Sequence, residues 1–77
     1  MSLYSVMLEG TDQRGRYLIT LDVSSYDDEQ AVTDAAQEAT KLGLMIVGVE
    51  ECECRGTTEN LIGLVKVYGK AYFAVNE

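Results

Sequence analysis

Apolar and polar residues alternate in two segments near the start of the chain, and this spacing predicts two strands. The alternation runs through Leu3–Glu9 and again through Arg16–Val23. A period of two places successive side chains on opposite faces of a sheet. The six residues between the segments begin and end with glycine, which suits a hairpin loop. The pattern therefore predicts an N-terminal β-hairpin. The residues expected to point inward are Tyr4, Val6, Leu8, Tyr17, Ile19, Leu21 and Val23.

The apolar spacing changes to that of a helix at Asp27–Leu42. Asp27 suits the N-cap position, and Gln30, three residues on, matches a capping box. Gly43 follows the last helical residue, and Leu44 stands where a Schellman motif makes its apolar contact. The stripe expected to face the sheet is rich in alanine, so we expect the helix to approach the sheet closely. This stripe consists of Val32, Ala35, Ala36, Ala39 and Leu42.

The next apolar run, Leu44–Cys54, predicts a third strand. Its first half is apolar on both faces, which favours a central position in the sheet. Gly48 lies within this run, and a glycine inside a strand marks a bulge or a close approach by another element. The second half becomes half-polar, as if the strand emerged toward solvent.

Two interpretations stay open for the last third of the chain. A helix begun by Thr57 or Thr58 and ended by Gly69 fits the apolar spacing. A hairpin of two strands, Leu64–Tyr68 and Ala71–Val75, also fits. We favour the hairpin, because a glycine at position 63 weakens a helix and the valines at 65 and 67 favour a strand.

Together these elements predict a single small α+β domain over residues 1–77. An antiparallel β-sheet, built from the N-terminal hairpin, the central strand and the C-terminal strand or hairpin, packs on one α-helix; a short second helix is the alternative in the last third. No run approaches the ~20 apolar residues of a transmembrane helix. The first four residues lack the features of a signal peptide. We therefore expect a cytoplasmic protein without membrane contact.

Negative charge is concentrated in one part of the chain. The whole sequence has thirteen acids and six bases, a net charge of -7. The stretch Asp22–Glu59 holds ten of these acids and two bases, a net charge of -8, so the remainder has a net charge of +1. A focused negative field repels nucleic acid and attracts basic protein surfaces. We expect no direct binding to nucleic acid.

The residue types needed for most enzyme chemistry are missing or poorly placed. The sequence has no histidine, which excludes Ser-His and Cys-His nucleophile pairs. Cys52 and Cys54 would have Cα atoms about 6.6 Å apart on a strand, near the outer limit for a disulfide. A metal site would need further histidine or cysteine ligands. We therefore expect a non-enzymatic protein with no metal and no cofactor, and two small buried thiols.

The acids are themselves the candidate site. Asp34 and Glu38 are i,i+4 neighbours on the helix, on the side away from the alanine stripe. Glu51 and Glu53 share one face of the third strand. If the acids of these two elements converge, they form one electronegative surface able to occupy a groove built for phosphates. Solubility alone is the competing explanation for the acidity. The expected partner-binding surface consists of Asp27, Asp28, Glu29, Asp34, Glu38, Glu50, Glu51, Glu53 and Glu59.

In its size, acidity and element order, the whole chain resembles the small inhibitors encoded by phages and mobile elements. It is most similar to anti-CRISPR proteins of the DNA-mimic type. The resemblance includes no specific motif, so no site residue carries over from it. It implies a non-enzymatic protein in the cytoplasm of a bacterial host. Such a protein binds the basic DNA-recognising surface of a CRISPR effector and blocks access to the target.

Two other functions stay open. A small regulatory or scaffolding module would bind a protein through apolar and tyrosine contacts, since tyrosine is enriched at interfaces. An antitoxin-like protein would neutralise a basic enzyme. Both a monomer and a homodimer are compatible with the sequence, because a small sheet with an exposed edge can pair with a second copy. The candidate anchors are Tyr4, Tyr17, Tyr26, Tyr68 and Tyr72.

Overall fold

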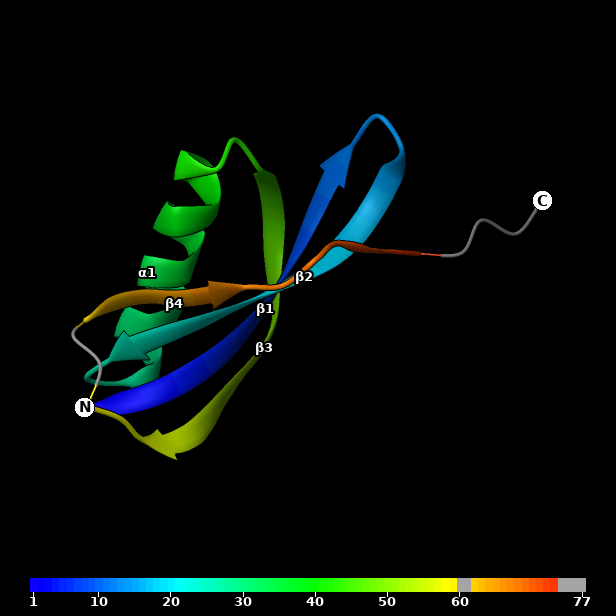
Figure 1. Cartoon of the computed structure of the whole chain (residues 1–77). Coiled ribbons are helices and arrows are strands. Elements are labelled where there is room, and N and C mark those ends of the chain that lie inside the picture. The colour runs from blue at the N-terminus through cyan, green and yellow to red at the C-terminus, as the bar shows by residue number, and fades with distance from the viewer. Residues whose placement is uncertain (60–61, 74–77) are drawn as a thin grey trace.

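The computed structural model describes residues 1–59 and 62–73 and has a small α+β fold (Figure 1). All strand pairs are antiparallel, in the order β3-β1-β2-β4, and β5 also pairs with β2. One helix packs on one face of this sheet, so the predicted fold class is confirmed. The elements are β1 (Ser2–Asp12), β2 (Gly15–Ser25), α1 (Asp28–Lys41), β3 (Met45–Thr57), β4 (Gly63–Val67) and β5 (Ala71–Tyr72).

The β1–β2 hairpin forms as predicted and supplies most of the core. Its register pairs Leu8 with Ile19, so the apolar residues of both strands share the face that α1 covers. All seven residues expected to point inward are buried. Near the tip, Gly10 pairs with Tyr17, and a Cβ at Gly10 would lie 2.4 Å from the Tyr17 ring. Glycine is required there because the ring occupies the space of a side chain.

The start of α1 has the predicted cap. The Asp27 carboxylate accepts a hydrogen bond from the backbone N–H of Gln30 at 2.8 Å. In a capping box the Gln30 side chain would reach back to the cap residue. Here its amide donates instead to Asp34, at 2.8 Å. The Asp27 carboxylate therefore satisfies one unpaired N–H group at the helix start, while the Gln30 side chain makes a contact along the helix surface.

The end of α1 is a Schellman motif, as predicted. The N–H of Leu44 donates to the Ala39 carbonyl at 3.0 Å, and the N–H of Gly43 donates to the Thr40 carbonyl at 3.0 Å. Gly43 has a φ of 79°, a conformation that side chains disfavour. This turn directs the chain back toward the sheet at the start of β3.

The buried stripe of α1 differs from the predicted one. The buried residues are Ala31, Ala35 and Ala39, while Ala36 is only half-buried. Leu42 is 53% exposed because it is the C-cap residue and lies beyond the last helical turn. The helix is therefore rotated relative to the expected stripe, and its alanines at every fourth position approach the sheet most closely.

β3 lies at an edge of the sheet, so the predicted central position is wrong. Among the described strands it pairs with β1 alone. Met45, Val47 and Val49 are 65%, 57% and 50% exposed. The apolar run therefore reflects exposed side chains and not burial on both faces. The register with β1 shifts next to Gly48, which favours the bulge over the close approach as the role of this glycine.

Strands form in the C-terminal segment, but they do not form a hairpin with each other. β4 pairs with one half of β2, through Leu21 and Val67, and β5 pairs with the other half, through Tyr17 and Tyr72. β2 has 11 residues, which is long enough to accept both. The segment 63–67 is a strand and not the alternative helix. Residues 60–61 and 74–75 of the predicted elements lie outside the described residues.

Candidate functional site

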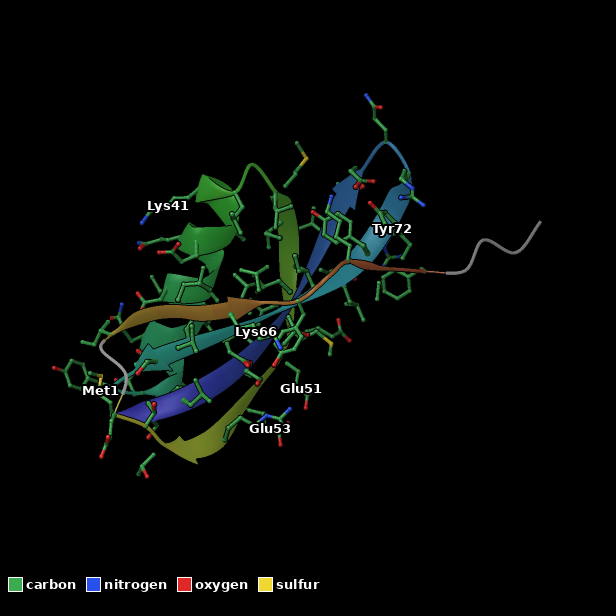
Figure 2. The ribbon with its side chains drawn as sticks, viewed as in Figure 1. Met1, Lys41, Glu51, Glu53, Lys66 and Tyr72 are labelled. Atoms are coloured by element: carbon green, nitrogen blue, oxygen red, sulfur yellow. The ribbon has the colours of Figure 1, made fainter. Side chains whose placement is uncertain are left out.

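The sheet separates the acids that the sequence suggested would converge. Glu51 pairs with Met7 and Glu53 pairs with Ser5, on the face of the sheet away from α1 (Figure 2). The intervening Cys52 points to the helix side, where its Sγ atom lies 4.0 Å from the Asp28 carbonyl oxygen. The expected single surface is therefore wrong. Residues at positions 51 and 53 alternate with those that face α1, so they lie across the sheet from the helical acids.

The open face of the sheet, which α1 does not cover, contains a hydrogen-bond network around Asp22. Ser5 and Tyr68 donate their hydroxyls to the two carboxylate oxygens, at 2.6 and 2.8 Å. Arg55 Nε donates to the Ser5 hydroxyl at 3.1 Å. The hydrogen bond to Asp22 raises the pKa of the Tyr68 phenol. Although Asp22 points outward as predicted, these neighbours leave it only 8% exposed.

Arginines lie beside two further acids of the open face, Glu9 and Glu53. The Arg16 guanidinium donates to the Glu9 carboxylate, at 2.8 Å for the shorter hydrogen bond. These hydrogen bonds, and then the negative charges of Glu9 and Glu50, raise the pKa of Arg16. Glu53 lies 3.9 Å from Arg55. Two shallow clefts on this face have volumes of about 80 and 290 Å³. Ligand pockets are usually ~300–1,000 Å³, so this face is not a typical small-molecule site.

The tip of the hairpin contains a polar network that the sequence analysis missed. Tyr72 and Lys70 both donate to the carboxylate of Asp12, with the lysine nitrogen 2.9 Å away. These bonds, the tyrosine one first, lower the pKa of Asp12 to about 2. The Tyr72 ring also packs edge-on against Tyr17, with centroids 5.6 Å apart. Because β5 is about 60 residues away in the chain, only its pairing with β2 brings these groups together.

Two of the predicted site residues on α1 are less available than expected. Asp34 and Glu38 are half-buried at the flank of the alanine stripe, and do not lie opposite it. One oxygen of Asp34 accepts from Gln30, and the other is shielded from solvent without a hydrogen-bond partner. Glu38 lies 3.3 Å from Lys41. These carboxylates are therefore not freely exposed anions.

Two segments that are distant in sequence meet at the end of the sheet where α1 begins. Ser2 pairs with Ser25, immediately before the helix. At the other border of β1, the N–H of Thr58 donates to the carbonyl of Met1 at 3.1 Å. The chain entering α1 and the chain leaving β3 therefore lie beside the same end of β1 (Figure 1).

This arrangement places four of the nine predicted acids at one end of the molecule. All four are exposed. The bordering segments 1–3, 23–29 and 56–59 contain no lysine or arginine. Tyr26, which directly precedes the acids of α1, is 71% exposed. We call this group the acidic end, and it consists of Asp27, Asp28, Glu29 and Glu59.

The tyrosines differ strongly in their availability as anchors. Tyr4 and Tyr17 belong to the core. The hydroxyls of Tyr68 and Tyr72 are bonded to aspartates. Tyr26 is the most exposed of the five. A tyrosine contact with a partner is therefore best supported at the acidic end.

The cysteines and the described metal-ligating groups give no indication of a second site. Cys52 is half-buried and Cys54 is exposed, and both are free thiols, so the expectation of two buried thiols is wrong for Cys54. Burial raises the pKa of Cys52. Within residues 1–59 and 62–73, no three potential ligands gather as a metal site requires. No helix in the same residues is long and apolar enough to cross a membrane.

Comparisons with protein-family models, with curated proteins and with solved structures each found no match to this chain. We therefore infer function from the arrangement of the chain's own residues.

Proposed function

We propose that this chain is a non-enzymatic inhibitory binding protein of the anti-CRISPR type. Its acidic end binds a basic, nucleic-acid-binding surface of a CRISPR effector in the bacterial cytoplasm. The supporting observation is that four exposed acids lie together without a lysine or arginine in the segments that border them. On the open face, Glu9 and Glu53 lie beside arginines and Asp22 accepts from two hydroxyls, so these three acids contribute less to an external field.

Electrostatic attraction explains how such a surface would act. Three consecutive carboxylates begin at Asp27, and Glu59 adds a fourth from the segment after β3. A surface evolved to hold phosphates presents lysines and arginines, so complementary charge accelerates the encounter. Tyr26 stands beside these acids and supplies a large rigid contact, of the kind that often carries much of the binding energy.

Because the sheet separates the acids, the proposed contact surface is limited to the acidic end. A surface that combined α1 with Glu51 and Glu53 would have extended over two elements. The acidic end replaces only a few phosphates, so it blocks a small basic patch and does not imitate a long stretch of DNA. Part of its acidity also stabilises α1, because carboxylates at a helix start favour the helix dipole.

A pair of neutralising variants tests the acidic end. Asp28→Asn with Glu59→Gln removes two charges while leaving the Asp27 cap intact. The matched control, Glu51→Gln with Glu53→Gln, removes the same charge from the open face. We expect the first variant to slow association with a binding effector about tenfold at low salt and to reduce the salt dependence. The control should differ from the unchanged protein by less than about twofold.

Competition with DNA tests inhibition itself. An effector bound by this protein should lose binding to its target DNA in proportion to the fraction occupied. If the complex forms and still engages target DNA normally, nucleic-acid competition is wrong. If both double variants bind equally well, the acidic end is not the contact.

The exposure of Tyr26 supports a second candidate, a regulatory or scaffolding module that binds through apolar contacts. For that function, Tyr26→Ala should weaken binding at least tenfold at both low and high salt, while the acidic variants have little effect. An antitoxin-like neutraliser of a basic enzyme would use the same acidic end. It would respond to the acidic variants but bind the enzyme and not a CRISPR effector.

A further inference from the structure

The flank of α1 next to β3 carries an open groove on the surface of the molecule. Its volume is about 600 Å³, and its lining contains no carboxylate. A neighbouring cavity of about 490 Å³ shares two of its residues and reaches Cys52 on β3. The groove is lined by Val32, Thr33, Ala36, Gln37, Thr40 and Lys41.

The groove lies between two rows of side chains spaced four residues apart along α1. One row, at positions 32, 36 and 40, contains only small uncharged residues. The other row begins with Glu29, continues through Thr33 and Gln37, and ends with Lys41. Rows of this spacing form the ridges that pack into the grooves of another helix. The second row is negative at the start of the helix, uncharged in the middle and positive at the end.

Two copies of this row have complementary charges when their helices are antiparallel. In an antiparallel helix pair, Glu29 of each copy faces Lys41 of the other, and the uncharged middles meet. A parallel pair would instead place like charges together. The Lys41 side chain is 71% exposed, and in the pair it would share its hydrogen bond to Glu38, at 3.3 Å, with Glu29 of the second copy. Asp34 and Glu38 are half-buried and do not line the groove, although Glu38 lies beside Lys41.

We propose that the groove is occupied by a second copy of this chain, with the two α1 helices antiparallel about a two-fold axis. Such a contact is isologous, so both copies use the same residues and the assembly closes as a dimer. Val49 adds apolar surface, since it is 50% exposed and pairs with the buried Leu8 on the helix side of the sheet. The proposal does not depend on the proposed function, although Asp28 and Glu29 of the acidic end border the helix pair.

The free edge of β3 is a less suitable contact than the groove. The register of β3 with β1 shifts at three places along the strand. Bulges of this kind twist an edge and interrupt the regular ladder that sheet extension needs. The two copies therefore meet through side chains. Because α1 has only 14 residues, the contact is smaller than a standard interface of ~1,200–2,000 Å², and we expect a dissociation constant in the micromolar range.

A charge exchange tests the antiparallel arrangement. Sedimentation equilibrium of the full chain should give twice the single-chain mass of 8.5 kDa at high concentration. Lys41→Glu alone and Glu29→Lys alone each create two like-charge contacts and should weaken the dimer about tenfold. The double variant, Glu29→Lys with Lys41→Glu, should restore it. Both changes are unfavourable to the helix dipole, so damage to folding would make the double variant the weakest of the three.

A steric variant and its control complete the test. Ala36→Arg places a long side chain in the middle of the groove and should abolish the dimer. Gln13→Arg, in the exposed β1–β2 turn, makes the same charge change away from α1 and should leave the dimer intact. Circular dichroism checks that both variants fold. A chain that stays monomeric up to ~1 mM overturns the proposal, even if a basic peptide then binds the groove. A dimer that survives Ala36→Arg, or that the double variant does not restore, overturns the antiparallel contact.

Discussion

The two faces of the sheet use the same strands for different purposes. On the face under α1, β1 and β2 contribute tightly packed apolar side chains. On the open face, the same strands contribute Ser5, Thr20 and Asp22. The Asp22 carboxylate accepts hydrogen bonds from the hydroxyls of Ser5 and Tyr68. Acids occur on both sides of the molecule, but the hydroxyls and bases of the open face hold several of them in place.

This difference shows that a count of acids does not locate a binding surface. A carboxylate that accepts two short hydrogen bonds contributes to the fold, whereas an exposed one contributes to the external field. The acids behind the net charge of -7 therefore differ in kind: Asp22 belongs to a hydrogen-bond network on the open face, whereas the carboxylates of the acidic end are exposed to solvent. Four sets of variants, from the largest expected effect to the smallest, test how packing and hydrogen bonding differ between these parts of the molecule.

Leucines on opposite faces of β2 should differ most. Leu21 is fully buried under α1, and Leu18 is half-buried on the open face. We expect Leu21→Ala to lower the free energy of unfolding by about 2–5 kcal/mol, and Leu18→Ala by about 1 kcal/mol. Urea denaturation measures both. Equal losses would mean that the open face is packed as tightly as the covered one.

The glycines of β1 and β3, Gly10 and Gly48, should differ next in their tolerance of a side chain. Gly10→Ala forces a methyl group against the Tyr17 ring, at 2.4 Å, and should cost about 1–3 kcal/mol. Gly48→Ala is the control, because nothing lies within 4 Å of a Cβ at that position. Thermal unfolding monitored by tyrosine absorbance would report both. A neutral Gly10→Ala would show that the ring can move away.

Two acids of the open face should respond differently to neutralisation. Asp22→Asn keeps the size of the side chain but replaces one acceptor oxygen with a donor, so it should cost about 1–2 kcal/mol. Glu51→Gln changes an exposed residue and should stay within about 0.5 kcal/mol. Chemical denaturation at neutral pH measures the pair. If Asp22→Asn is also neutral, the network around Asp22 does not stabilise the fold.

The hairpin tip should give the smallest effect, visible as a dependence on pH. The pKa of Asp12 is lowered from 3.8 to about 2 in the folded chain. Its contribution to stability is therefore fully present above the unfolded pKa and is lost as the pH falls through the folded one. Melting temperatures of the protein and of Asp12→Asn should converge between pH 4 and pH 2. Tyr72→Phe should weaken this pH dependence, and an unchanged profile would contradict the role of Tyr72.

Local patterns predicted the elements whose determinants lie close together in sequence. The alternation in β1 and β2 and the two caps of α1 depend on neighbouring residues, and the structure has them where the sequence placed them. The position of β3 depends on pairing across the sheet. A central strand and an edge strand with exposed side chains can contain the same apolar run. The exposed Val47 and Val49 therefore led to the wrong prediction of a central position for β3.

The candidate site was only partly predictable for the same reason. The acids at 27–29 are consecutive, so their proximity follows from the sequence. Glu59 lies near these acids because β3 pairs with β1. Glu51 and Glu53 lie on the other face of the sheet, because the register of β3 decides which of its side chains face α1. No local sequence pattern predicts the contact of Asp12 with Tyr72, since it forms only when β5 pairs with the N-terminal half of β2.

The divided pairing of β2 has one more consequence, for aggregation. The chain has no proline to interrupt strand addition. Yet the side of the sheet beyond β2 ends in two short pieces, of five and two residues, with lysines at 66 and 70. Short, charged and interrupted borders are poor templates for a growing fibril. The C-terminal segment thereby protects a strand-rich protein from polymerising along that side.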